Sequence, residues 1–226
     1  MSPLPPEGSP LGGSPPARSL PQAFDVLNFW FGPRPYSAAQ VQQHSRLWFG
    51  EPDAPELIPQ TDELVRERFG ELTRAAALGS LSAWESGPRR RLALILLLDQ
   101  FPRNIFRGTA RAFAQDRQAL SLTLNGMQFG ADATLDPVER IFFYMPLMHA
   151  EDADVQEEGV AAFRRLRAEA PAELSAIFNG SLSSALEHRD IIARFGRFPH
   201  RNRSLGRENT AEETHWLATT GRNFGQ

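Results

Sequence analysis

The chain of 226 residues contains no cysteine and no lysine, so all 24 of its basic residues are arginine. Without cysteine, neither a disulfide framework nor a thiolate metal site can form, which fits a reducing compartment. Without lysine, a Schiff-base lysine and the lysine of a phosphate-binding P-loop are both excluded. The longest apolar run, Leu92 to Leu98, is far shorter than the roughly 20 residues that cross a membrane. We therefore expect a cytoplasmic protein that makes no membrane contact.

Motifs that hold phosphates or activate a nucleophile are also missing. The sequence has no G-x-S-x-G, no G-x-G-x-x-G and no G-x-x-x-x-G-K, so nucleophilic catalysis has little support and we expect no cofactor. A net charge of -3, with one arginine-rich loop and no basic helix face, falls short of the footprint of a nucleic-acid-binding protein. We therefore expect no nucleic-acid partner.

The composition separates a short leader from the rest of the chain. Apolar residues make up 41% of the sequence and charged residues 23%, as in an ordinary globular protein. Residues 1–20 differ, because they are rich in proline, glycine and serine and lack the basic and apolar regions of a signal peptide. We expect a disordered leader over residues 1–20 and one all-α domain over residues 21–226.

From residue 22 onward apolar residues recur at helical spacing, and no segment alternates with a period of two. The run from Leu92 to Leu98 is apolar on all sides, which predicts a central buried helix that Pro102 ends. The pattern as a whole predicts an all-α fold of about nine or ten helices, packed in antiparallel pairs and joined by short connections.

Capping residues mark several helix ends. The pairs Asp136 with Glu139 and Thr210 with Glu213 have the spacing of a capping box, in which two side chains satisfy free N–H groups at the helix start. Gly196 follows an apolar helical stripe and should stop its helix, because glycine adopts the left-handed conformation that ends many helices.

Three polar residues lie on the apolar sides of predicted helices, near the ends of those helices. Asp99 follows the run 92–98, His149 follows Met145 by four residues, and His188 precedes apolar residues at offsets of three, four and seven. A buried polar group destabilises a fold unless it has a partner, so we expect these three helix ends to converge. Each histidine taken alone fits a hydrogen-bonded core residue better than a catalytic one.

Arginines gather in two loops and are the strongest sign of a binding site. Arg103 and Arg107 lie in the segment 99–108, and the segment 194–208 packs five arginines around His200. Guanidinium groups bind carboxylates and phosphates in a bidentate manner, so these loops could hold an anionic ligand. They could equally pair with acidic residues of the chain in a structural network. The acidic candidates for such pairing are Asp99, Asp116, Glu151 and Asp152.

The two loops also resemble each other. FPRNIFRG at 101–108 and FPHRNRSLG at 198–206 both read R-N-x-x-x-G, with Phe-Pro just upstream. Such an echo can mark a shared way of leaving a helix, with proline, asparagine and glycine forming the turn. It can also mark two loops that face each other and supply arginines to one site.

A metal site is conceivable from the sequence alone. Histidine and carboxylate ligands could come from His149, Glu151, Asp152, His188 and His200. Their spacing matches no recognised metal motif, and the acidic residues after His149 also suit the start of a helix, where carboxylates complement the dipole. We therefore assign no metal ligand.

A resemblance to a known family rests on four segments, which are VLNFWFG, RLALILLLDQFPRNIFRGTARAFAQD, ERIFFYMPLMHAED and HRDIIARFGRFPHRNRSLGRENTAEE. From about Phe24 to the helix expected at 211–219, the chain resembles the bacterial family catalogued as domain of unknown function 924. The resemblance implies a tetratricopeptide-like helical fold and no established activity. Small departures at Ala150 and near 153–154 leave the histidine and the acids in place. The positions that match the family motifs are Asp99, Gln100, Phe101, Pro102, Arg103, Asn104, His149, Glu151, Asp152, His188, Arg197, Phe198, Pro199, His200, Arg201 and Asn202.

Two functions of different classes remain open. In the first, a polar pocket binds a small anionic ligand and could act on it by acid–base chemistry, which predicts an open cleft. In the second, the chain is a scaffold for a protein partner, and its arginines, histidines and aspartates form a buried, fully paired network. For acid–base chemistry we predict His149, His200, Asp99 and Asp152. For ligand binding we predict Gln100, Arg103, Asn104, Arg107, His188, Arg197, Arg201 and Asn202.

Overall fold

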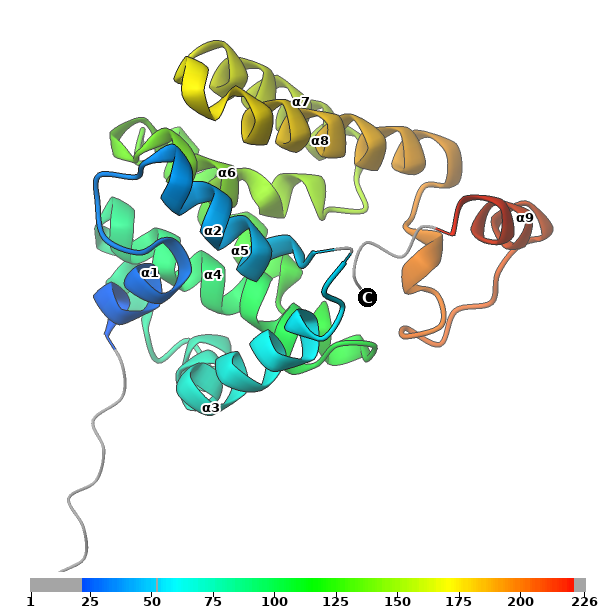
Figure 1. Cartoon of the computed structure of the whole chain (residues 1–226). Coiled ribbons are helices and arrows are strands. Elements are labelled where there is room, and N and C mark those ends of the chain that lie inside the picture. Colours follow the sequence, from blue (N-terminus) through cyan, green and yellow to red (C-terminus); the bar gives the residue numbers. More distant parts are fainter. Residues whose placement is uncertain (1–21, 52, 222–226) are drawn as a thin grey trace, which may run out of the picture.

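The computed structural model describes residues 22–51 and 53–221, and within these ranges the chain forms helices and no strand (Figure 1). The predicted all-α fold is confirmed. The predicted leader, residues 1–20, lies outside the described residues, and the single domain over residues 21–226 stays a prediction. None of the described helices is long and apolar enough to cross a membrane. The α-helices are α1 (Ala23–Phe31), α2 (Ala38–Phe49), α3 (Leu57–Ala77), α4 (Pro88–Ile105), α5 (Asp116–Gln128), α6 (Pro137–Met148), α7 (Ala153–Ala168), α8 (Ser175–Phe195) and α9 (Ala211–Thr220). Short 3-10 helices are η1 (Ser82–Ser86), η2 (Ala110–Ala112), η3 (Asp132–Thr134), η4 (Ala172–Leu174) and η5 (Pro199–Arg201).

Helix α4 forms the centre of the core, and α1, α3, α5 and α6 pack around it. Every residue from Leu92 to Leu98 is at most 2% exposed. A helix that is apolar on all sides must be covered on all sides, so this run selects the central position. The prediction of a central buried helix is confirmed.

The end of α4 differs from the prediction, because the helix passes through Pro102 and continues to Ile105. Proline removes one N–H donor and crowds the preceding turn, which disfavours a helix at this point. Here Phe101 and Ile105 lie in the core, and the side chain of Arg103 donates from Nη1 to the carbonyl oxygen of Asp99 at 2.6 Å. Burial and this hydrogen bond stabilise the last turn against the proline.

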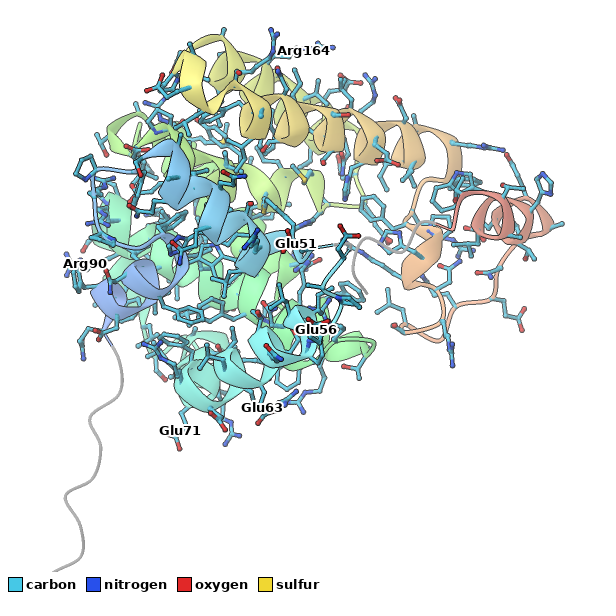
Figure 2. The ribbon with its side chains drawn as sticks, in the orientation of Figure 1. Glu51, Glu56, Glu63, Glu71, Arg90 and Arg164 are labelled. Carbon is cyan, nitrogen blue, oxygen red and sulfur yellow. The ribbon has the colours of Figure 1, made fainter. Side chains whose placement is uncertain are left out.

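The remaining helices form pairs around the centre. Helix α3 packs along α4, and α7 packs along both α6 and α8, so consecutive helices lie side by side (Figure 1). Helix α2 crosses in front of α6 and contacts α1, α3 and η4. Charged side chains cover the outside: Glu63 and Glu71 on α3 and Arg164 on α7 point away from the body of the molecule (Figure 2).

The predicted capping box at the start of α6 also anchors a distant segment. Oδ1 of Asp136 accepts from the backbone N–H of Val138, and Glu139 accepts from the N–H of Asp136. The side chain of Glu139 is fully buried, and it also binds Tyr36 at 2.8 Å and Arg34. The segment between α1 and α2 is thereby fixed against α6.

The C-terminal part of the chain has a smaller apolar cluster of its own. Helix α8 ends at Gly196, which has a left-handed φ of 68°, as predicted. After it, Phe198 packs against the end of α8, and Phe195 packs against Trp216 of α9. The predicted capping box of Thr210 with Glu213 is present at the start of α9, which lies at the edge of the molecule (Figure 1).

Candidate ligand-binding site

An open cavity of about 930 Å³ lies between α2 and α8, above the C-terminal ends of α4 and α6 and beside η5. This volume falls within the range of sites that hold small molecules. Most of the residues predicted for a site line this cavity. These are Gln100, Arg103, Asn104, Arg107, His149, His188, His200 and Arg201.

Asp99 lies directly behind the cavity and is fully buried. Its Oδ1 accepts a hydrogen bond of 2.7 Å from Nδ1 of His149, and its Oδ2 accepts from the amide of Gln100. Burial alone would raise the pKa of the Asp99 carboxyl, but the charge of Arg103 and the hydrogen bond from His149 hold it below its usual range. Asp99 is therefore a carboxylate in the core.

The protonation of His149 follows from that of Asp99. Burial and the charge of Arg103 lower the pKa of His149, although Asp99 opposes them, so the imidazole is neutral at pH 7. A carboxylate only accepts hydrogen bonds, so the proton of the ring is on Nδ1. Nε2 then carries a lone pair, and it accepts no hydrogen bond from any described residue. Because His149 lines the cavity, this nitrogen is available to a ligand.

Two further histidines surround this position. The ring of His188 lies 6.1 Å from that of His149, and its Nδ1 donates to the carbonyl oxygen of Ser184 at 2.7 Å. Burial, aided by the neighbouring His149, lowers the pKa of His188 to about 3. Burial and the charge of Arg201 lower the pKa of His200 to about 3. All three rings are therefore neutral at physiological pH.

Arg103 and Arg201 share one acidic partner. Arg103 binds both carboxylate oxygens of Asp116 at 2.8 and 2.9 Å, and Nη1 of Arg201 binds Oδ2 of Asp116 at 3.2 Å. The guanidinium of Arg201 lies between the rings of Phe113 and Phe198, at 4.6 and 4.4 Å from their centres. Burial and the nearby charge of Arg103 lower the pKa of Arg201 to about 10, so it remains a cation.

A third ion pair completes the charged wall. Arg107 binds both oxygens of Asp62 at 2.6 and 2.8 Å, and the amide of Asn104 donates to the same carboxylate at 2.9 Å. Three arginines around the cavity are thus matched by three aspartates. The arginines are Arg103, Arg107 and Arg201, and the aspartates are Asp62, Asp99 and Asp116. The wall carries no net charge.

The two loops with the shared R-N-x-x-x-G pattern meet in the structure. Ser204 donates to the carbonyl oxygen of Gly108 at 3.2 Å, and the first arginine of each pattern reaches Asp116. The two loops therefore contact each other, and each supplies one arginine to the same aspartate.

A family model described as a bacterial protein of unknown function (DUF924) matches residues 26–221. The chain belongs to this family. The match covers both arginine loops and every residue that lines the cavity. It confirms the family resemblance seen in the sequence, whereas the tetratricopeptide-like arrangement stays an expectation.

A solved structure has the same fold as this DUF924 chain. It is that of a protein of unknown function, ATU0120 from Agrobacterium tumefaciens, which is 36% identical in sequence with a TM-score of 0.71. The alignment covers 87% of this chain and 97% of that one. No curated protein matches the chain. The DUF924 relationship therefore supplies a fold and a family without an activity.

Besides Asp99, which lies behind the cavity, three other predicted site residues do not line it. Asp152 is the N-cap of α7, where its Oδ1 accepts from two backbone N–H groups at 3.0 Å. Arg197 binds both oxygens of Glu213 at 2.6 and 2.8 Å, and Asn202 donates to the same carboxylate. All three stabilise helix ends. They were predicted for the site because a sequence pattern does not distinguish a polar group that caps a helix from one that faces a ligand.

The residues considered for a metal shell are not grouped for that purpose. Among the described residues, no group of three or more histidine, aspartate or glutamate side chains is placed to hold a metal ion. Glu151 instead forms a bidentate pair with Arg207 at 2.7 and 2.9 Å and accepts from the backbone N–H of Phe198.

Phe113 lines the cavity, and Asp62 and Asp116 pair with arginines that line it. The sequence indicates Asp116 only as a candidate partner for arginine and gives no sign of Asp62 or Phe113. The sequence does indicate the face of α8 before His188. Ser184 and Ser181 precede that histidine by four and seven residues and so lie on its side of the helix. The wall from α2 had no such signal.

Proposed function

We propose that the cavity binds a small acidic molecule, with its acidic group between His149 and Arg201. One observation carries this proposal: His149 presents to the same cavity that Arg201 lines a neutral Nε2 that has no hydrogen-bond partner among the described residues. Arg201 has more donors than partners, since a guanidinium has five N–H groups and, within the part of the chain that the structure describes, this one makes a single hydrogen bond, to Asp116. Its Nε is buried and has no acceptor in residues 22–51 and 53–221.

A carboxylic acid satisfies both residues at once. One oxygen of the group accepts from Arg201, and the O–H donates to Nε2 of His149. Because the three arginines and three aspartates balance, the site favours an acid that arrives together with its proton over a bare anion. Inorganic phosphate in its singly charged form offers the same pair of groups.

The same arrangement supports acid–base chemistry as an extension of binding. Asp99 fixes the tautomer and orientation of His149, so that Nε2 is the nitrogen that exchanges a proton with a bound molecule. Proton transfer within hydrogen-bond distance is the one chemical step that these residues supply. Binding is therefore the function proposed, and His149 is the group through which a reaction would proceed.

A scaffold for a protein partner is the second candidate, and one observation favours it. Arg103, Arg107 and Arg201 all form ion pairs with aspartates of the chain, as expected of a structural network. Such a network would hold the two loops together without any ligand. The cavity and the open ring nitrogen of His149 favour the first candidate.

Isothermal titration calorimetry distinguishes the two candidates. We would titrate the full chain with hexanoate, benzoate, malate and inorganic phosphate, and with hexylamine as a cationic control. At least one acid should bind the wild type, and Arg201→Gln should weaken that binding at least tenfold. Arg197→Gln is the matched control, because Arg197 also forms a bidentate ion pair but lies outside the cavity.

The outcome is clear in either direction. Loss of binding in Arg201→Gln, with Arg197→Gln binding as the wild type does, supports the proposal. Because Arg201→Gln removes an ion pair, its fold is checked by circular dichroism at the titration temperature. Binding of no acid by the wild type, or equal binding by a folded Arg201→Gln protein, overturns the proposal and favours the protein partner.

A further inference from the structure

The cavity is elongated along α8. Ile177, Gly180, Ser181, Ser184 and His188 all line it, at the spacing of one helix face. Ile177 and His188 are eleven residues apart in one helix, which corresponds to about 16 Å at 1.5 Å per residue. A ligand that touches both ends of this face must therefore be long rather than compact.

The chemistry of this face changes along its length. At one end His188 lies beside His149 and Phe198. In the middle, Gly180 has no side chain and Ser184 has a small one, and a Cβ built on Gly180 meets no atom within 4 Å. At the other end Ile177 is followed outward by Leu174. Along α8 the residues that line the cavity thus change from polar at His188, through residues with little or no side chain, to apolar at Ile177.

Helix α2 supplies an apolar wall opposite this face. Val41, Trp48 and Phe49 line the cavity from α2, and Ile58 continues the wall at the start of α3. Phe49 is 56% exposed although it lines the cavity, so a large aromatic surface is left for an occupant to cover. On the floor, Met145 and Met148 add flexible apolar side chains that adapt to different shapes.

Charge is confined to the polar end and to the outer rim. Arg46 and Glu173 are the charged residues that line the cavity away from the polar end, and both are exposed. Arg46 is paired with Glu51 at 3.2 Å. A second acidic group on the ligand would therefore find no unpaired cation along the apolar wall, which favours a molecule with a single acidic group.

We infer that the occupant is an amphiphilic monocarboxylic acid with an extended hydrocarbon chain. Its carboxyl group lies at His149 and Arg201, and its chain runs along α8 past Gly180 toward Ile177. This inference rests on the proposed function and specifies the ligand class for the same site. Gly180 and Ser184 are then the positions that admit the hydrocarbon.

A homologous series of straight-chain acids tests this inference. We would titrate the full chain with butanoate, hexanoate, octanoate and decanoate by calorimetry, below the concentration at which each acid forms micelles. Each additional buried methylene should tighten binding about fourfold. The matching alcohols, hexanol and octanol, carry the chain without the carboxyl group and should bind at least tenfold more weakly.

A variant that fills the space beside Gly180, which we call the slot, provides the second part of the test. Gly180→Leu should remove the gain with chain length and leave butanoate binding unchanged. Asn179→Leu is the matched control, because Asn179 is the adjacent residue on α8, is exposed and does not line the cavity. It should leave the whole series as in the wild type.

The results separate this inference from the proposed function. If butanoate and decanoate bind equally well, or if Gly180→Leu leaves the affinities of the series unchanged, the hydrocarbon chain does not occupy this slot. The inference is then wrong, but the proposed binding of an acid stands. If the alcohols bind as tightly as the acids, the carboxyl group is not recognised and both fall. If no acid of any length binds, both fall as well. A steady gain with chain length that only Gly180→Leu abolishes supports the inference.

Discussion

Nδ1 of His149 lies 2.7 Å from Oδ1 of Asp99, and this hydrogen bond joins the C-terminal ends of two different helices, α6 and α4. The aspartate is completely buried behind the cavity, where it also pairs with Arg103. Arg103 compensates the charge of Asp99. The hydrogen bond from His149 to Asp99 ties the two helices together and leaves the opposite nitrogen of the imidazole facing the cavity. The same contact therefore matters for stability and for ligand binding.

Replacement of Asp99 tests the structural part of this role. Asp99→Asn removes the charge that pairs with Arg103 and places an amide donor among donors, so we expect the free energy of unfolding to fall by about 3 kcal/mol. Urea unfolding followed by circular dichroism measures the change. Asp152→Asn is the control, because asparagine caps a helix as well as aspartate does, and it should change stability by less than about 0.5 kcal/mol. Equal effects of the two substitutions would show that Asp99 has no special role in the core.

The buried histidines make stability depend on pH. In the unfolded chain a histidine titrates near pH 6.5, whereas burial lowers the pKa of His188 and of His200 to about 3 in the folded protein. Between these values the unfolded chain binds more protons, so the free energy of unfolding decreases as the pH falls below 6.5. The expected slope is about 1.4 kcal/mol per pH unit for each histidine.

Urea midpoints at pH 7, 6 and 5 measure this slope, and His188→Asn assigns part of it. Asparagine keeps a donor near the position of Nδ1 for the carbonyl oxygen of Ser184 but does not titrate, so the slope should decrease by the share of one histidine. His215→Asn is the exposed control on α9 and should leave the slope as it is. A wild-type stability that stays constant from pH 7 to pH 5 would mean that these imidazoles bind protons in the folded protein at the same pH as in the unfolded chain.

The sequence predicts the centre of the site because its pattern there is local. Asp99, His149 and His188 each follow or interrupt an apolar helical stripe, and buried polar groups need partners, so their convergence follows from helix periodicity alone. The two arginine loops could be recognised from their shared motif. The cap residues were predicted for the same reason, since a capping box spans only four positions.

The rest of the site depends on how helices pack, which no local pattern specifies. Asp116 meets Arg201 across a separation of 85 residues, and the wall from α2 faces the cavity only because α2 lies against η4 and α3. Arg197 is the converse case: the motif that contains it marks a loop, but its guanidinium points to Glu213 and away from the cavity. The end of α4 was mispredicted because core burial of Ile105 outweighs the effect of Pro102.

Two glycines within helices should respond in opposite ways to the same substitution. A Cβ on Gly126 of α5 would lie 2.5 Å from Cζ of Phe143, whose ring is fully buried and cannot move aside, so Gly126→Ala should destabilise the fold by about 2 kcal/mol. Gly180→Ala on α8 meets open space and should stabilise it by up to about 1 kcal/mol, because alanine favours the helix. Thermal unfolding of both variants measures the difference. Destabilisation by Gly180→Ala would contradict the open space beside α8.

Binding of an acid should be accompanied by the uptake of one proton. In the free protein burial and the charge of Arg103 lower the pKa of His149, so Nε2 is unprotonated at pH 7. A carboxylate placed against Nε2 favours the charged imidazole and raises its pKa, so the complex holds one proton more than its separate components.

The sign of the pH effect follows from this proton. Above the pKa that His149 has in the free protein, the affinity for an acid should decrease up to tenfold per pH unit as the pH rises. Calorimetry of hexanoate at pH 7 in Bis-Tris and in Tris, which differ in their enthalpies of ionisation and are not anions that could occupy the site, measures the proton directly. In His149→Gln the uptake should vanish, whereas His215→Gln should keep it. Binding of hexanoate with the same heat in both buffers would place its carboxyl group away from His149, because a carboxylate paired only with Arg201 needs no additional proton.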